Sequence, residues 1–172
     1  AVGCDQQLRS DKENMTVALR NDVNCANGNF YVKKTGNDYN DGTSWMNAFA
    51  SVEHAIMTIR DLRKSMLYAN THINLHIAAG EYSPEKSQGF EFPDNVTIYG
   101  GYDELPTDNS LSGTMRNPVS PANKNGYATI FRSDSASQRI VNLIDEDNVK
   151  LVGIHFVGDQ LTTNTDGRAI YV

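Results

Sequence analysis

The stretch DNVTIYG at Asp94–Gly100 returns as DNVKLVG at Asp147–Gly153, 53 residues further along the chain. Each copy has an acidic-amide pair that favours a turn, then alternating apolar residues, then a glycine. Such self-similarity is typical of repeat architectures, in which neighbouring units stack to bury a common core. The repeat therefore predicts stacked β-strands.

Apolar strand centres extend this pattern beyond the two copies. They lie at Ile73, Val96, Thr129, Val149 and Ile170, which are separated by 23, 33, 20 and 21 residues. The long step contains residues 103–127, which are rich in Pro, Asn, Ser and Gly and predict an inserted loop. This register places the Thr129 strand between the two copies. It indicates an all-β parallel β-helix, or solenoid, whose strands pair with neighbours about 4.8 Å above and below.

The residues ahead of this array predict one strand and one helix. Asn29–Lys34 reads as a short strand. From Ser51 to Leu67, apolar residues recur at three- and four-residue steps, as one face of a helix requires. The helix is expected to cap the exposed edge of the first coil. We therefore expect residues 29–172 to form one capped β-helix domain.

Residues 1–28 are interpreted as a flexible polar tether. Ala1–Cys4 resembles the end of a bacterial lipobox, in which Cys4 carries the lipid anchor. The residues Asp5–Asn14 are almost wholly polar and could not bury enough surface to fold alone. Two alternatives stay open, a disulfide between Cys4 and Cys25 or two unrelated thiols. A lipidated Cys4 excludes the disulfide.

Charge and hydropathy limit the partners of the chain. Its formal net charge of −6 opposes nonspecific attraction to nucleic acid or to anionic lipid. No apolar run approaches the roughly 20 residues that span a bilayer. We therefore expect no nucleic-acid partner, and contact with a membrane only through a lipid anchor.

A further set of segments spans most of the chain. They are FYV (30–32), TGNDYNDGTSW (35–45), NAF (47–49), IAAGEY (77–82), VTIYGGY (96–102), VKLVGIHFVG (149–158) and GRAIY (167–171). These segments resemble the start of pectin-lyase-like right-handed parallel β-helix proteins of bacterial surfaces. The resemblance implies a right-handed solenoid with an amino-terminal capping α-helix and further coils. It is specific for fold and implies no activity.

One predicted corner carries acidic residues. Asp145–Asp147 has Arg139, Lys150 and His155 nearby in sequence. A carboxylate pair supports glycosidic hydrolysis, and a basic residue beside calcium supports lyase chemistry. No complete lyase or hydrolase motif is present, so we assign no catalytic residue, no metal ligand and no cofactor.

Four tyrosines are the candidate ligand-binding residues. Sugar rings bind by stacking an apolar face on an aromatic side chain that has polar groups beside it. Tyr99 occupies an outward position in the predicted strand, and Tyr102, Tyr127 and Tyr171 lie near loop boundaries. The single tryptophan, Trp45, is interpreted as a packing residue.

These features predict a non-catalytic bacterial cell-surface lipoprotein, a β-helix scaffold that binds glycan or docks on an outer-membrane nutrient-import complex. The expected partners are a polysaccharide and an outer-membrane protein that covers the open end of the coils. The expected location is the outer membrane or cell surface, otherwise the periplasm or the medium. Two alternatives stay open: the amino-terminal part of a polysaccharide lyase or glycoside hydrolase, and a structural adhesin segment.

Overall fold

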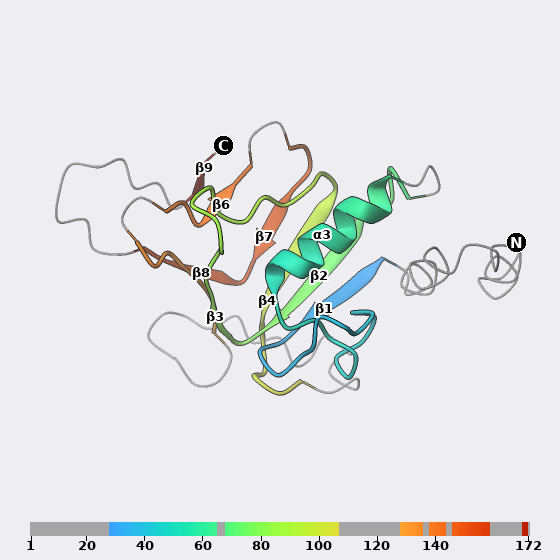
Figure 1. Ribbon diagram of the computed structural model, residues 1–172, viewed down its shortest axis with the longest axis horizontal. Helices are drawn as coiled ribbons and strands as arrows, with labels where there is room; N and C mark the ends of the chain where they lie inside the picture. The colour runs from blue at the N-terminus through green and yellow to red at the C-terminus, as the bar shows by residue number, and fades with distance from the viewer. Residues whose placement is uncertain are drawn as a thin grey trace, which may run out of the picture.

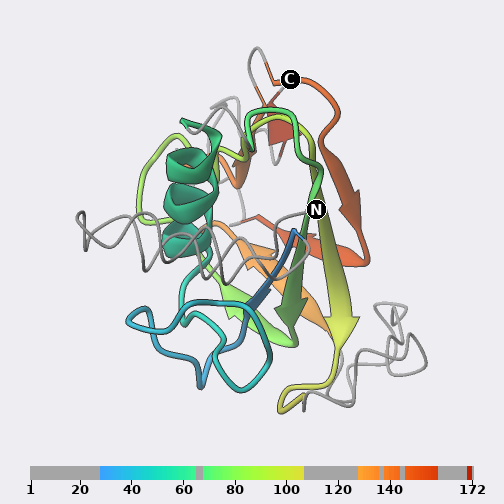
Figure 2. The same ribbon diagram turned by 90° about the vertical axis from the view of Figure 1, so that its right-hand side faces the viewer.

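The computed structural model describes residues 28–64, 68–106, 128–135, 138–143, 146–158 and 170–171, the last pair by backbone only. Its elements in chain order are β1 (Asn29–Val32), α3 (Val52–Arg63), β2 (Ile73–Ala78), β3 (Gly80–Tyr82), β4 (Val96–Tyr102), β5 (Thr129–Arg132), β6 (Val141–Asn142), β7 (Lys150–Val152), β8 (Ile154–Val157) and β9 (Ile170–Tyr171). The strands form three parallel sheets, ordered β1-β2-β4-β7, β3-β5-β8 and β6-β9 (Figure 1). Figures 1 and 2 together show α3 on one face of the four-stranded sheet.

The two copies of the repeat are direct neighbours in the four-stranded sheet. Ile98 on β4 is in register with Leu151 on β7. The prediction that the Thr129 strand lies between the copies is wrong, because β5 pairs with β3 and β8 in a different sheet. Ile170 likewise belongs to the β6-β9 sheet. Apolar spacing locates strands in the chain, but it does not say which sheet each strand joins.

The expected fold class, an all-β right-handed parallel β-helix with a capping helix, is also wrong. The described residues form a mixed α/β structure, with short strands in parallel sheets and one helix. Helix α3 buries a full face in the same apolar cluster as Leu75 and Ile98 from the sheets. That face consists of Val52, Ala55, Ile56, Ile59 and Leu62. The helix is thus part of the core, because its apolar stripe fills space that the short strands leave between them.

The start of α3 is held by the preceding loop. The Asp38 carboxylate accepts hydrogen bonds from the Ala50 N–H at 2.8 Å, the Ser51 N–H at 3.0 Å and the Ser51 hydroxyl at 2.8 Å. The Ser51 Oγ in turn accepts from the His54 N–H at 3.2 Å, which makes Ser51 the N-cap. The helix begins where the sequence predicts and ends at Arg63, before the predicted Leu67.

The repeated Asp-Asn pair forms two stacked turns. Asn95 and Asn148 have φ values of 58° and 56°, in the left-handed region that asparagine tolerates better than most residues. The Asn148 side-chain amide donates to the Asn95 Oδ1 at 2.6 Å, and the Asn95 N–H donates to the Asp147 carbonyl at 2.9 Å. The recurring amide therefore both permits the turn and joins it to its neighbour.

Replacing Asn148 separates these two roles. Asn148→Ala is expected to lower the free energy of unfolding by about 1–2 kcal/mol. Alanine is strained at positive φ, and it cannot form the side-chain hydrogen bond to Asn95. Asn148→Gly loses the side-chain hydrogen bond but is not strained at positive φ. Its free energy of unfolding should therefore lie between those of the wild type and the alanine variant. Urea denaturation of the three proteins measures these free energies of unfolding. Equal losses in the two variants would show that left-handed strain contributes nothing.

Candidate ligand-binding site

The structure gathers two of the predicted tyrosines around one histidine. The Tyr99 ring stacks on His76 with centroids 5.5 Å apart, and His76 stacks on Tyr31 at 4.9 Å. Tyr102 is buried, and its hydroxyl forms a 2.6 Å hydrogen bond with the His76 Nδ1. On its other side Tyr99 is in register with Val152. A ligand at this column would therefore meet ring edges rather than ring faces.

Other predicted residues are dispersed or lie outside the described part. Cys4, Tyr127, Asp145 and the side chain of Tyr171 lie outside the described residues. Trp45 is fully buried, with ring centroids 4.9 Å from Tyr31 and 5.1 Å from Tyr102, which confirms its packing role.

In the predicted acidic corner, Glu146 is partly buried and forms a hydrogen bond with Asp94. Burial raises the pKa of Glu146, and its hydrogen bond to Asp94 raises it further. Lys150 and His155 lie on β7 and β8, which belong to different sheets. Among the described residues, no group of three or more His, Cys, Asp or Glu side chains could hold a metal ion.

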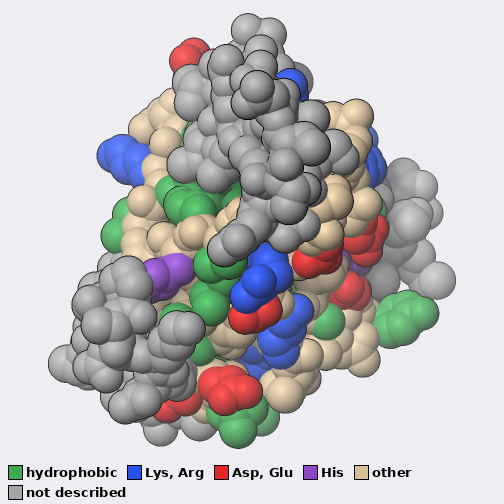
Figure 3. Space-filling view, turned by 90° about the vertical axis from the view of Figure 1, so that its left-hand side faces the viewer, with side chains coloured by type: hydrophobic (Ala, Val, Ile, Leu, Met, Phe, Trp, Pro, Cys, Tyr) green, Lys and Arg blue, Asp and Glu red, His purple; other side chains and the backbone are tan. Residues whose placement is uncertain are grey.

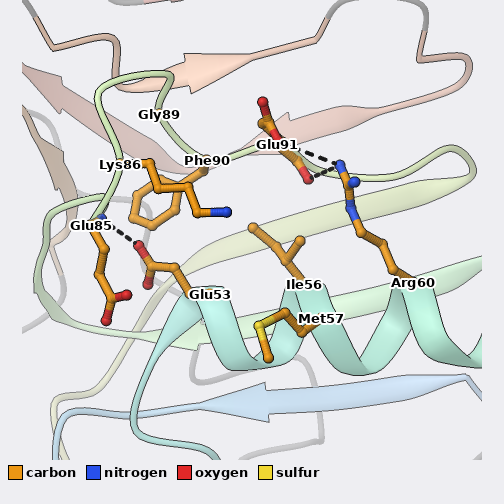
Figure 4. Close-up of a pocket in the computed structure, with 9 residues that line it drawn as sticks. All are labelled: Glu53, Ile56, Met57, Arg60, Glu85, Lys86, Gly89, Phe90 and Glu91. Atoms are coloured by element: carbon orange, nitrogen blue, oxygen red, sulfur yellow. Dashed lines mark hydrogen bonds and ion pairs between the residues drawn. The ribbon is translucent and has the colours of Figure 1, made fainter.

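A pocket of about 280 Å³ lies between α3 and residues 85–91 (Figure 4). Nine residues line it: Glu53, Ile56, Met57, Arg60, Glu85, Lys86, Gly89, Phe90 and Glu91. The apolar stripe of the helix predicts packing, and residues 85–91 match no motif that would predict a site. The available signal was weak, because Met57 adjoins that stripe but belongs to no motif.

One side of the pocket is apolar. Ile56 and Phe90 are almost fully buried, whereas the Met57 side chain is 60% exposed. The Phe90 N–H donates to the Ile140 carbonyl at 2.9 Å, which ties the loop to the strand region behind it. Gly89 has a φ of 88°, and a Cβ at this position would lie 2.8 Å from the Arg139 carbonyl oxygen. The loop is thus held in close backbone contact, which fixes that side of the pocket.

Glu53 and Glu85 form one end of the pocket. The Glu53 Oε1 accepts a hydrogen bond from the Glu85 N–H at 2.9 Å (Figure 4). Burial raises the pKa of Glu53, and the Glu85 carboxylate raises it further, while the hydrogen bond and the charge of Lys34 oppose the shift. This end therefore holds a partly desolvated carboxyl group beside a second carboxylate.

Arg60 forms the opposite end. Its Nη2 donates to the Glu91 carbonyl at 2.9 Å and lies 3.9 Å from the Glu91 carboxylate and 3.7 Å from the Glu146 carboxylate. The Lys86 side chain extends from the loop with its amine directed toward the pocket (Figure 4). The rim thus offers donors and acceptors around an apolar wall.

Charges of both signs also lie together elsewhere. On the face shown in Figure 3, acidic and basic side chains are interleaved. Away from the pocket lining, Arg132 and Glu81 form an ion pair at 2.9 Å. In the described part of the chain, no helix is long and apolar enough to span a bilayer.

No family model, curated protein or solved structure matches the chain. The resemblance to pectin-lyase-like proteins stays a prediction, and the site is interpreted from its own geometry.

Proposed function

We propose that this chain is a non-catalytic saccharide-binding protein of the bacterial cell surface, and that the pocket beside α3 holds the sugar. The observation that carries the proposal is an apolar wall enclosed by a rim of charged side chains. A pyranose ring has an apolar C–H face and a hydroxyl edge, so it is complementary to such a pocket. The volume of about 280 Å³ is at the small end of ligand pockets, which suits one ring rather than an extended chain.

The rim groups match the hydroxyl edge of a sugar. Carboxylates such as Glu53 and Glu85 accept hydrogen bonds from hydroxyl groups, and the Lys86 ammonium donates them. Hydrogen bonds to charged groups are stronger than those between neutral groups. Met57 is exposed and can cover the apolar ring face.

Met57→Ala is expected to weaken saccharide binding about fivefold to tenfold, because it removes apolar wall that the ring would bury. The wild type would first be tested on a glycan array, and the best oligosaccharide would then be titrated by calorimetry.

Met46→Ala is the matched control, since Met46 is 74% exposed and does not line the pocket. Its affinity should equal that of the wild type. An array without any binding to the wild type, or equal losses in the two variants, would contradict the proposed site.

The surface location rests on the sequence. Cys4 followed by a polar run supports a lipid tether. Mass spectrometry of the native protein tests this part, and an unmodified Cys4 would remove the anchor from the proposal while leaving the pocket unaffected.

One observation favours a rival function. A carboxyl group with a raised pKa beside a second carboxylate is the arrangement that glycoside hydrolases use as acid and nucleophile or base. Glu53 and Glu85 both line the pocket, and the Glu53 carboxyl accepts the Glu85 N–H at 2.9 Å. Incubation of the bound oligosaccharide with the wild type and with Glu53→Gln decides between them. If the wild type releases new reducing ends and Glu53→Gln does not, the pocket hydrolyses the oligosaccharide, and the proposed function as a non-catalytic binder is wrong.

A further inference from the structure

The guanidinium of Arg60 keeps hydrogen-bond donors that the protein does not use. Its Nη2 donates to the Glu91 carbonyl at 2.9 Å. The carboxylates of Glu91 and Glu146 lie 3.9 Å and 3.7 Å from this nitrogen, which is too far for a hydrogen bond. Within the described part of the chain, the Nε and Nη1 of Arg60 donate to no acceptor. A guanidinium carries several N–H donors, so most of them are available to a ligand.

The Glu91 carboxylate places an acceptor beside these donors. Its Oε1 accepts from the Asn142 Nδ2 at 3.4 Å. Its Oε2 is the atom that faces Arg60 (Figure 4), and it accepts no hydrogen bond from the described residues. The side chains of Arg60 and Glu91 both line the pocket and are 44% and 41% exposed, so a ligand can reach them. One end of the pocket thus presents a charged donor next to a charged acceptor.

The charges around the pocket do not favour an anionic ligand. The charged side chains that line it are three carboxylates and two cations: Glu53, Glu85, Glu91, Arg60 and Lys86. The charge of Arg60 is already offset by the two carboxylates near it. A ligand carboxylate would be repelled by these groups. The group that complements Arg60 and Glu91 is therefore neutral, and it both donates and accepts hydrogen bonds.

Resting on the proposed saccharide site, we infer that Arg60 and Glu91 bind two adjacent hydroxyl groups of a neutral pyranose. One hydroxyl accepts a hydrogen bond from the Arg60 guanidinium, and its neighbour donates one to the Glu91 Oε2. Both bonds involve a charged group and are therefore stronger than bonds between neutral groups. The sugar ring fixes the two hydroxyls relative to each other, so little conformational freedom is lost on binding. The ring itself lies on the apolar wall at Ile56 and Met57.

Methyl glycosides that lack single hydroxyl groups test the inference. The methyl α-pyranosides of glucose, mannose and galactose are titrated first, by NMR. The tightest of them is then compared with its 3-deoxy and 6-deoxy derivatives. Each derivative lacks one hydroxyl, but only the loss of the central ring hydroxyl breaks both adjacent pairs of the ring. The wild type is expected to bind the 3-deoxy sugar about tenfold more weakly than the 6-deoxy sugar.

Three variants test the assignment to Arg60 and Glu91. In Arg60→Met and in Glu91→Met, the two deoxy sugars should bind with affinities within about twofold of each other. Lys64→Met is the matched control, because Lys64 is an exposed cation at the C-cap of α3 that does not line the pocket. It should keep the tenfold difference of the wild type. Both sugars are compared on the same protein, so a change in its stability does not imitate the effect.

The outcomes distinguish this inference from the proposed function. Equal binding of the two deoxy sugars to the wild type would overturn the role of adjacent hydroxyls and leave the saccharide site standing. So would binding of array glycans without binding of any of the three parent glycosides. A difference that persists in both Arg60→Met and Glu91→Met would overturn the assignment to these residues. Failure of the wild type to bind any glycoside or any array glycan would overturn both proposals. Thermal denaturation confirms that each variant compared is folded.

Discussion

Gly100→Ala is expected to destabilise the protein by about 3 kcal/mol. Gly100 closes the first copy of the repeat, where β4 lies against the chain that links β7 to β8. A Cβ on this residue would lie 2.5 Å from the Gly153 carbonyl oxygen and 2.8 Å from the Thr129 Cβ. Neither atom is the flexible end of a side chain, so relief requires a backbone shift. The added methyl group would therefore separate strands that belong to different sheets.

Urea denaturation measures this effect, and Gly158→Ala is its control. A Cβ on Gly158 would meet no atom within 4 Å. The control should change the free energy of unfolding by less than about 0.5 kcal/mol. A Gly100→Ala loss no larger than that of Gly158→Ala would show that the close approach does not limit stability.

Arg63→Lys should cost about 2–4 kcal/mol, although it conserves the charge. The Arg63 Nη1 donates to the carbonyls of Tyr68 and Thr71, and its Nη2 donates to the Asp94 carbonyl at 2.9 Å. One planar group thus joins the end of α3 to the next loop and to the first Asp-Asn turn. An ammonium has three donors at a single point and cannot span these carbonyls. The Tyr68 carbonyl would keep its bond from the Thr71 N–H, but the Thr71 and Asp94 carbonyls would lose the Arg63 donor.

The control is Arg132→Lys. Arg132 forms an exposed ion pair with Glu81, and pairs of this kind contribute about 1 kcal/mol or less. Both variants are unfolded in urea under identical conditions. Equal losses in the two variants would contradict the role of Arg63 as a fixed link between three segments.

Local features were predictable from the sequence because their causes are local. The spacing of apolar residues predicted α3 with its N-terminal boundary at Ser51, since one buried face needs that period. The repeated Asp-Asn pair predicted turns, and Asn95 and Asn148 have the dihedral angles that require such residues. The alternation after each pair predicted strands, and those strands pair in parallel.

Sheet membership was less predictable. The segments at Thr129 and Val149 have similar alternating apolar patterns. The strands that they form, β5 and β7, nevertheless belong to different sheets. The buried Thr129 hydroxyl explains part of this arrangement, because its Oγ1 donates to the Ile77 carbonyl at 3.0 Å and accepts from the Gly101 N–H at 3.1 Å. These contacts tie the second sheet to the first. Residues 52 and 28 positions apart make them, so no local pattern encodes them.

Residue spacing alone predicted α3, the strands of the repeat and the Asp-Asn turns, since backbone dihedrals and side-chain period depend on neighbouring residues. The mixed α/β class, the stacking of the two turns and the pocket depend instead on contacts between residues far apart in the chain. Glu53 meets the backbone of Glu85 across 32 residues, and Arg60 meets Glu91 across 31. Such contacts depend on how α3 packs on the sheets, and packing is set by the shape of the whole core.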